Sequence, residues 1–174
     1  DSKGLLKSAI RDNDPVILME PEHMYGDKGE VPDGEYTIPL GVADVVREGT
    51  DVTIVSFGKI IKEAFKAADD LAKEGISCEV IDLRTVRPMD TEAILKSVKK
   101  TNRLVILEEA WPFASVSSEI TYLVQEQAFD FLDAPIQRIT TADTPAPYSP
   151  VLLKEWLPNA DDVVKAVKKV LYKK

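Results

Sequence analysis

Residues 78–90, Cys-Glu-Val-Ile-Asp-Leu-Arg-Thr-Val-Arg-Pro-Met-Asp, join a short apolar segment to a loop of unusual composition. The apolar segment predicts a strand over residues 78–82, and Asp90 is placed to cap a helix that begins after the loop. A tight turn between a strand and a helix does not need two arginines and a proline for folding. Since this loop follows the carboxyl end of a strand, it lies where open α/β sheets carry their functional surfaces.

Two other predicted strands end in equally unusual loops. Residues 108–113, Glu-Glu-Ala-Trp-Pro-Phe, follow a strand predicted over 104–107, and residues 141–148, Thr-Ala-Asp-Thr-Pro-Ala-Pro-Tyr, follow one predicted over 136–140. The carboxyl ends of parallel strands meet at one edge of a sheet. We therefore expect the three loops to gather at that edge.

Hydrophobic periodicity divides most of the chain into alternating helices and strands. Residues 21–36 contain several Gly and Pro and almost no apolar periodicity, so they are interpreted as a linker or arm. The alternation predicts a three-layer α/β/α fold in which a mainly parallel sheet is covered on both faces. Helices are predicted near residues 5–12, 61–71, 90–98, 116–124 and 159–171, and strands over 16–19, 51–56, 78–82, 104–107 and 136–140.

Composition and charge restrict the classes of partner. The net charge of -8 argues against nucleic acid, whose phosphates need a basic patch, and suits a basic protein partner. No apolar run is long enough to span a bilayer, and the first residues carry no secretion signal. Cys78, the one cysteine, is expected to be a small core residue in a reducing compartment. Because the first residue is Asp rather than Met, we interpret the chain as a processed product, a trimmed form or a fragment.

The sequence offers no obvious catalytic constellation. Its one histidine, His23, lies in the predicted linker without a serine or cysteine nucleophile nearby, and one cysteine excludes a cysteine-based metal site. Neither a Walker loop nor a G-x-G-x-x-G motif is present. Glu108 and Glu109 are adjacent, so at a strand end they point to opposite faces and do not form a cooperating acid–base pair. We expect no active site in this chain alone.

Five motifs occur in order along the chain: residues 8–13, 20–26 ending in Met-Tyr-Gly, 82–90, 108–112 and 131–135 (Phe-Leu-Asp-Ala-Pro). Together they resemble the beta subunit of the first, decarboxylating component of pyruvate dehydrogenase. The resemblance covers essentially the whole chain but only the back half of such a subunit. It implies a tail of the pyrimidine-binding domain at residues 1–20, a linker or arm at 21–40 and a transketolase-type carboxyl-terminal domain at 41–174.

The resemblance also implies a division of labour. With an alpha subunit, such a protein decarboxylates pyruvate and reductively acetylates the lipoyl group of an acyltransferase. In the family, thiamine diphosphate lies between alpha and beta subunits of a heterotetramer; the alpha subunit holds the diphosphate and magnesium, and the activating glutamate lies in the front half of beta. No catalytic or cofactor-binding residue is therefore assigned here. The expected partners are the alpha subunit, a second beta subunit and the subunit-binding domain of the acyltransferase, in the bacterial cytoplasm or the mitochondrial matrix.

A structural potassium ion is the first binding site that the resemblance implies. In relatives it lies at the end of the helix that matches residues 5–12 and is held by main-chain carbonyls and an acidic side chain. Such oxygen ligands suit hard cations, and helix ends expose free carbonyls. Asp14 replaces the asparagine common in the family, and the alternative is a plain helix stop before Pro15. The matching positions are Ala9, Ile10, Asp12 and Asp14.

A docking site for the acyltransferase is the second implied site. Asp133 matches the beta-subunit aspartate that pairs with a basic residue on the subunit-binding domain. The terminal carboxylate of Lys174 matches a position that also contacts that domain. The alternative for Asp133 is a turn-forming role before Ala134 and Pro135.

Four loop residues are candidates for a subunit interface. Arg84 and Arg87 suit carboxylates across an interface, because the guanidinium fork matches their geometry, or they brace the loop itself. Trp111 and Phe113 are typical of interface anchors, with core packing as the alternative.

Other functions remain open from the sequence. A branched-chain 2-oxoacid or acetoin dehydrogenase beta subunit would share the fold and the cofactor. A non-catalytic docking and dimerisation module belongs to a different class, and a free-standing ligand-binding α/β domain is the third alternative.

Overall fold

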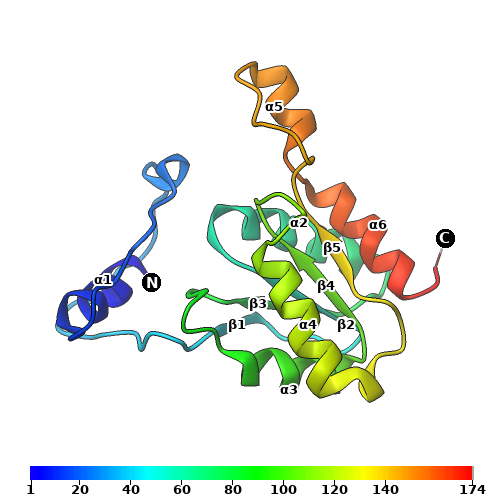
Figure 1. Cartoon of the computed structure of the whole chain (residues 1–174), viewed down its shortest axis with the longest axis horizontal. Helices are drawn as coiled ribbons and strands as arrows, with labels where there is room; N and C mark the ends of the chain where they lie inside the picture. The colour runs from blue at the N-terminus through cyan, green and yellow to red at the C-terminus, as the bar shows by residue number, and fades with distance from the viewer. Residues whose placement is uncertain (174) are drawn as a thin grey trace.

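The computed structural model describes residues 1–173 and places five strands and six α-helices within them (Figure 1). Three short 3-10 helices, η1 (Glu22–Met24), η2 (Gly58–Ile60) and η3 (Phe129–Phe131), occur between them. The strands are β1 (Asp44–Arg47), β2 (Val52–Ser56), β3 (Cys78–Asp82), β4 (Leu104–Leu107) and β5 (Gln137–Ile139). The helices are α1 (Ser2–Arg11), α2 (Ile61–Lys73), α3 (Thr91–Thr101), α4 (Val116–Ala128), α5 (Pro150–Trp156) and α6 (Ala160–Val170).

The sheet is mainly parallel, which confirms the prediction. Its order is β1-β3-β2-β4-β5; β2 pairs in parallel with β3 and β4, and β4 pairs in parallel with β5. Every residue of β2 and β4 is buried, as expected for strands that are covered on both faces. Only β1 is antiparallel, along the free edge of β3, with a register shift between Val45 and Arg47.

Two helices cover each face of the sheet, so the predicted three-layer architecture is also confirmed (Figure 1). Alternate β2 side chains point to opposite faces: Val52 and Ile54 pack with α2 and α6, whereas Val55 packs with α3 and α4. The predicted cap at Asp90 forms as well. Asp90 accepts a hydrogen bond from the Ala93 amide at 2.9 Å, and Asn159 forms a capping box at the start of α6.

Three local expectations differ from the structure. Residues 16–19, predicted as a strand, form no strand and are exposed, with Ile17 at 86% and Met19 at 85%, because no neighbouring strand is present for them to pair with. The strand β1 was not predicted, since its short sequence is half exposed at a sheet edge. The helix α5 was not predicted either, because it buries none of its residues and so shows no apolar face.

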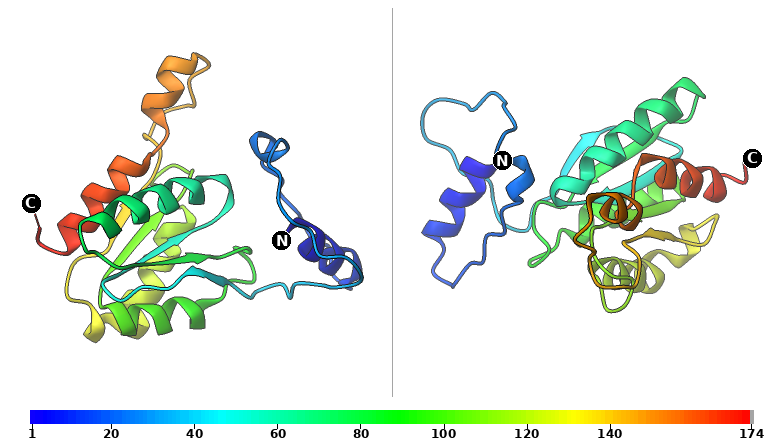
Figure 2. Two further views of the ribbon diagram at one scale, coloured as in Figure 1. Left: turned by 180° about the vertical axis from the view of Figure 1, so that it is seen from behind. Right: turned by 90° about the horizontal axis from the view of Figure 1, so that it is seen from above.

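The first forty residues lie beside the sheet domain (Figure 2). The helix α1 packs against residues 35–38. Gly4 lies against Ile38 and Tyr36, and Lys7 and Arg11 both form ion pairs with Glu35. A short chain segment then leads into β1. None of the helices in residues 1–173 is long and apolar enough to cross a membrane.

Candidate functional site

The carboxyl ends of the four parallel strands lie at one edge of the sheet, as predicted. After β2 the chain turns to α2 on one face, and after β4 it turns to α4 on the other, so this edge contains a topological switch point. Lys59 and Glu109 bridge the two loops there, with Nζ 3.0 Å from Oε1. Residues 19–23, around the start of the arm, lie beside the loop after β2 and line with it and Glu109 an open hollow of about 300 Å³.

The loop after β3 is braced from within. The Thr85 hydroxyl donates to the Pro88 carbonyl at 2.8 Å and accepts from the Gly41 amide at 3.0 Å. Gly41 has φ +82, and a Cβ there would lie 2.9 Å from Cγ of Pro88, so this position requires glycine. The Arg87–Pro88 peptide bond is cis. This unusual loop therefore has a defined conformation within this chain.

Arg84 supports the loop through ion pairs inside the chain. Its guanidinium donates to the Asp1 carboxylate at 3.0 and 2.8 Å and to Asp44 at 2.7 Å. Burial raises the pKa of the neighbouring Asp82 carboxyl, although the amide and charge of Arg84 act in the opposite direction. Of the two interpretations open for Arg84, this geometry favours bracing. Arg87 is exposed, and its interface role stays a prediction.

The aromatic residues of the loop after β4 point outward. Phe113 is 86% exposed and Trp111 is 54% exposed, so neither packs in the core. The indole of Trp111 donates to the Thr144 carbonyl at 3.0 Å, and the indole of Trp156 donates to the same carbonyl at 3.0 Å. The loops after β4 and β5 are thereby tied together, and their aromatic rings remain available for an interface.

The adjacent glutamates point in different directions, as predicted. Glu108 is fully buried, and its carboxylate accepts from the Ser117 amide at 3.3 and 3.2 Å at the start of α4. Glu109 is exposed and pairs with Lys59. Glu108 therefore stabilises the amino-terminal end of a helix, and the two carboxylates do not share a site.

The helix α5 extends the exposed apolar surface at this edge. It projects from the domain above the sheet, next to the loop that contains Tyr148 (Figure 1). Tyr148, Val151 and Leu152 are 103%, 74% and 57% exposed. Together with Trp111 and Phe113 they form what we call the edge patch. Sequence periodicity did not identify α5, although Pro150 at its first turn was a usable start signal.

Asp133 lies at the opposite edge, where β4 and β5 begin. Its amide donates to the Asn102 carbonyl at 2.9 Å, and its carboxylate lies 3.2 Å from the Arg103 guanidinium. The Tyr172 hydroxyl donates to the Asp133 carbonyl at 3.1 Å, which brings the last turn after α6 beside it. Lys174, the other predicted docking residue, lies outside the described residues.

The four predicted potassium ligands lie at the end of α1. Asp12 caps this helix, and its amide donates to the Ser8 carbonyl at 3.0 Å. The Asp12 carboxylate also accepts from the Asp14 amide at 2.9 Å. Ile10, Asp12 and Asp14 are exposed and Ala9 is half-buried. The potassium site stays a prediction.

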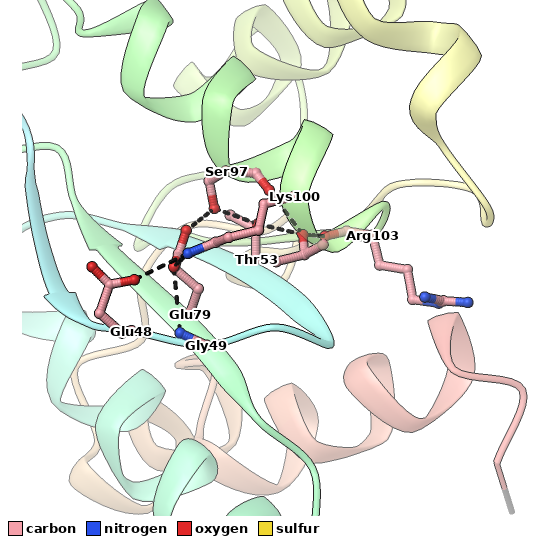
Figure 3. Close-up of polar contacts among 8 residues, drawn as sticks. Glu48, Gly49, Thr53, Glu79, Ser97, Lys100 and Arg103 are labelled. Carbon is pink, nitrogen blue, oxygen red and sulfur yellow. Dashed lines mark hydrogen bonds and ion pairs between the residues drawn. The ribbon is translucent and has the colours of Figure 1, made fainter.

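A buried polar network not expected from the sequence joins β2 and β3 to α3 (Figure 3). Glu79, which is 2% exposed, accepts from the Ser97 hydroxyl at 2.5 Å and from the Gly49 amide at 3.3 Å, and it pairs with Lys100. The Thr53 hydroxyl lies 2.6 Å from the Ser97 hydroxyl. The sequence signal was a glutamate and a threonine at inward positions of otherwise apolar strands.

The hydrogen bonds of this network shift the pKa values of Glu79 and Lys100. Burial tends to raise the pKa of Glu79, but the hydrogen bonds from Lys100, Ser97 and Gly49 outweigh it and hold that pKa below the usual value. The carboxylate of Glu79 in turn raises the pKa of Lys100. Gly49 is required at the network, because a Cβ there would lie 2.2 Å from the Cys78 backbone. All polar groups are paired within the protein, so the network stabilises the fold and does not form an open site.

Two further sequence interpretations concern single residues. Cys78 is 1% exposed, which confirms that it is a core residue, and burial raises the pKa of its thiol to about 12. His23 is exposed in η1. Within residues 1–173, no three His, Cys, Asp or Glu side chains are grouped so as to hold a metal ion.

Comparisons with known proteins agree with this architecture. Residues 41–163 match the family described as "Transketolase, C-terminal domain". A solved structure titled "Split gene transketolase, inactive beta4 tetramer" is similar with a TM-score of 0.70 and 30% identity, over 83% of this chain and 46% of that chain.

Curated relatives match almost the whole chain. It is 51% identical over 172 residues to the pyruvate dehydrogenase E1 component subunit beta of Rickettsia felis. It is 50% identical over 171 residues to the acetoin:2,6-dichlorophenolindophenol oxidoreductase subunit beta of Bacillus subtilis. These alignments cover 99% and 98% of this chain but 53% and 50% of the two relatives. The chain therefore spans about half the length of the curated relatives it matches.

Proposed function

Because the chain belongs to the family of transketolase C-terminal domains, we propose that it is the carboxyl-terminal segment of a pyruvate dehydrogenase beta subunit. Such a subunit, together with an alpha subunit, decarboxylates pyruvate and reductively acetylates the lipoyl group of an acyltransferase. The observation that carries the proposal is 51% identity to a subunit of that name along 99% of this chain. The segment serves subunit assembly and docking, and it is not catalytic alone.

The proposed domain organisation follows from the same assignment. Residues 1–20 are the tail of a pyrimidine-binding domain, 21–40 are the arm, and 41–174 are the transketolase-type domain. The exposed apolar residues at 16–19 support this division, because a segment of this kind is stable when a neighbouring sheet covers it. The front half of the subunit is proposed to supply that sheet.

Thiamine diphosphate and magnesium are the cofactors proposed for the intact heterotetramer. The residues of this chain do not fit them: Lys59, in the loop after β2, pairs with Glu109, and no group of three metal-binding side chains is formed within residues 1–173. We assign no step of the reaction to this chain. A potassium ion at Ala9, Ile10, Asp12 and Asp14 remains part of the proposal for the intact subunit.

Assembly is proposed to use the carboxyl edge of the sheet. The edge patch exposes large apolar and aromatic side chains, and aromatic residues are enriched at protein interfaces. The proposed partners there are the alpha subunit and a second beta subunit, with Arg87, Trp111 and Phe113 as contacts. Arg84 acts at this edge by holding the loop after β3 in place.

Docking is proposed to use Asp133 at the opposite edge. Its side chain is 56% exposed, and a hollow of about 440 Å³ lies beside it, between α4 and residues 132–136. The chain is acidic overall, which favours a basic partner such as the subunit-binding domain of the acyltransferase. Lys174 is proposed to contribute to the same docking surface. Because the two surfaces lie at opposite edges of the sheet, one domain can assemble and dock at the same time.

An acetoin dehydrogenase beta subunit is the second candidate, since the Bacillus subtilis relative is 50% identical over a similar length. It differs in substrate but not in the assembly and docking roles proposed here. The proposed compartment is the cytoplasm of a bacterium or the mitochondrial matrix of a eukaryote, in line with the sources of the relatives.

Calorimetric titration tests the docking role. The chain is titrated with the isolated subunit-binding domain of an acyltransferase from a pyruvate dehydrogenase complex, at low and high salt, beside the variant Asp133→Ala. We expect binding that weakens with salt and is lost in the variant. Binding that Asp133→Ala leaves unchanged, or no binding at all by the folded chain, contradicts the docking assignment.

A further inference from the structure

Arg103 forms an ion pair with one oxygen of the Asp133 carboxylate. Its Nη2 lies 3.2 Å from Oδ2 of Asp133, and its Nε donates to the Val170 carbonyl at 3.1 Å. The guanidinium is thus held from two sides, and its side chain is only 24% exposed. Arg103 therefore stays beside Asp133 and does not extend into solvent like an ordinary surface arginine.

The backbone of Asp133 is held in place by two hydrogen bonds. The Asn102 carbonyl accepts its amide, and the Tyr172 hydroxyl donates to its carbonyl. The carboxylate interacts with Arg103 through Oδ2, whereas Oδ1 receives no hydrogen bond within residues 1–173. A basic partner therefore meets one free oxygen and a fixed positive charge next to it.

We propose that Arg103 is a specificity-determining residue of the docking surface, which weakens the binding of basic partners by sharing the Asp133 carboxylate with them. The inference rests on the docking function proposed for Asp133. A partner cation bound at Oδ1 lies a few ångströms from the guanidinium, and like charges at that separation repel each other. Arg103 therefore favours a partner whose cation contacts Oδ1 from the side away from the guanidinium. It disfavours a partner whose cation must contact Oδ2, where the guanidinium already lies.

A matched set of variants separates this role from a general effect of charge. Arg103→Gln removes the cation and keeps a polar side chain, and Arg103→Met removes the cation and keeps an unbranched apolar side chain. Arg103→Lys keeps the charge without the planar fork. Lys99→Gln is the control, because it removes one positive charge from the same region, where Lys99 lies 5.3 Å from the ring of Phe131 and forms no ion pair with Asp133.

The experiment is a calorimetric titration of each folded variant with the subunit-binding domain. We expect Arg103→Gln and Arg103→Met to bind about fivefold more tightly than the unchanged chain, which corresponds to about 1 kcal/mol at 25 °C. The gain should shrink at high salt, since screening weakens the repulsion. Arg103→Lys and Lys99→Gln should bind within about twofold of the unchanged chain, a difference below about 0.5 kcal/mol.

Each other outcome contradicts a defined part of the reasoning. Equal or weaker binding by both Arg103→Gln and Arg103→Met shows that Arg103 braces Asp133 and does not compete for it, which overturns the inference while the docking site stands. An equal gain in Lys99→Gln reduces the effect to net charge and also overturns it. If Asp133→Ala binds as well as the unchanged chain, the docking assignment itself is wrong.

Discussion

Replacing Ser97 with alanine should lower the free energy of unfolding by about 2 kcal/mol at pH 7. The Ser97 hydroxyl donates to the Glu79 carboxylate at 2.5 Å, and the two residues are 3% and 2% exposed. Water does not reach the site to replace the lost donor. A hydrogen bond to a charged group contributes about 1.5–3 kcal/mol, and about 2 kcal/mol lowers Tm by roughly 4–8 °C in a chain of this size.

Ser56→Ala is the matched control. Ser56 is equally buried, at 0% exposure, but its hydroxyl has no hydrogen-bond partner within residues 1–173. Its removal leaves no partner unsatisfied, so stability should be unchanged or rise by up to about 1 kcal/mol. The assay is urea unfolding followed by circular dichroism, with equal slopes required for the comparison. Equal decreases in the free energy of unfolding in the two variants would refute the stabilising role of the buried network around Glu79. A decrease below about 0.5 kcal/mol for Ser97→Ala would refute it as well.

The cost of Ser97→Ala should also depend on pH. The folded-state pKa of Glu79 lies below its usual value of 4.5, so its ionised form stabilises the fold above that pH. This stabilisation is lost as the pH falls through the folded-state pKa. The difference in the free energy of unfolding between the unchanged chain and Ser97→Ala should therefore become smaller below about pH 4.5. A difference that becomes larger there would contradict the assignment of a charged Glu79.

Trp111→Ala should weaken self-association or binding to the alpha subunit by about 2 kcal/mol in sedimentation measurements, with little change in Tm, because Trp111 is 54% exposed. A large fall in Tm without a change in association would indicate packing instead. Asn159→Ala should cost about 1 kcal/mol of stability through the lost capping box of α6, whereas Asn13→Ala, on an exposed residue beyond α1, should not. The thiol of Cys78, whose pKa burial raises to about 12, should resist iodoacetamide at ~pH 8 until the chain unfolds, and rapid native labelling would show that the strand is open. The chain alone should show no oxoacid decarboxylation, and activity in a pure preparation would contradict the proposed division of roles.

Much of the fold could be predicted from the sequence because the signals were local. The apolar runs of β2 and β4, the apolar stripe of α2 and the cap at Asp90 each lie within a few residues of one another. Alternation of these elements was enough to predict the layers and the edge at which the unusual loops meet. The strand predicted at residues 16–19 was wrong for this chain, because a strand needs a partner as well as an apolar sequence.

Site residues were identified less completely than the fold. The outward position of Trp111 and Phe113 required the structure, since an aromatic residue after a strand suits a core as well as an interface. The sequence did not distinguish between an interface contact and a loop-bracing role for Arg84. The structure favours bracing, because Asp1 and Asp44 lie beside its guanidinium. The pairing of Arg103 with Asp133 joins residues thirty positions apart, and nothing in either local sequence indicated it.

The sequence by itself determined the α/β architecture and the family resemblance, because hydrophobic periodicity, caps and loop motifs are properties of neighbouring residues. Only the tertiary structure decided that β1 adds to the free edge of β3, that Glu79 is buried with Ser97 and Lys100, and that Trp111 and Asp133 lie at opposite edges of the sheet. These features depend on contacts between distant segments. Their free energy comes from the burial and pairing of groups that the chain brings together only when it folds.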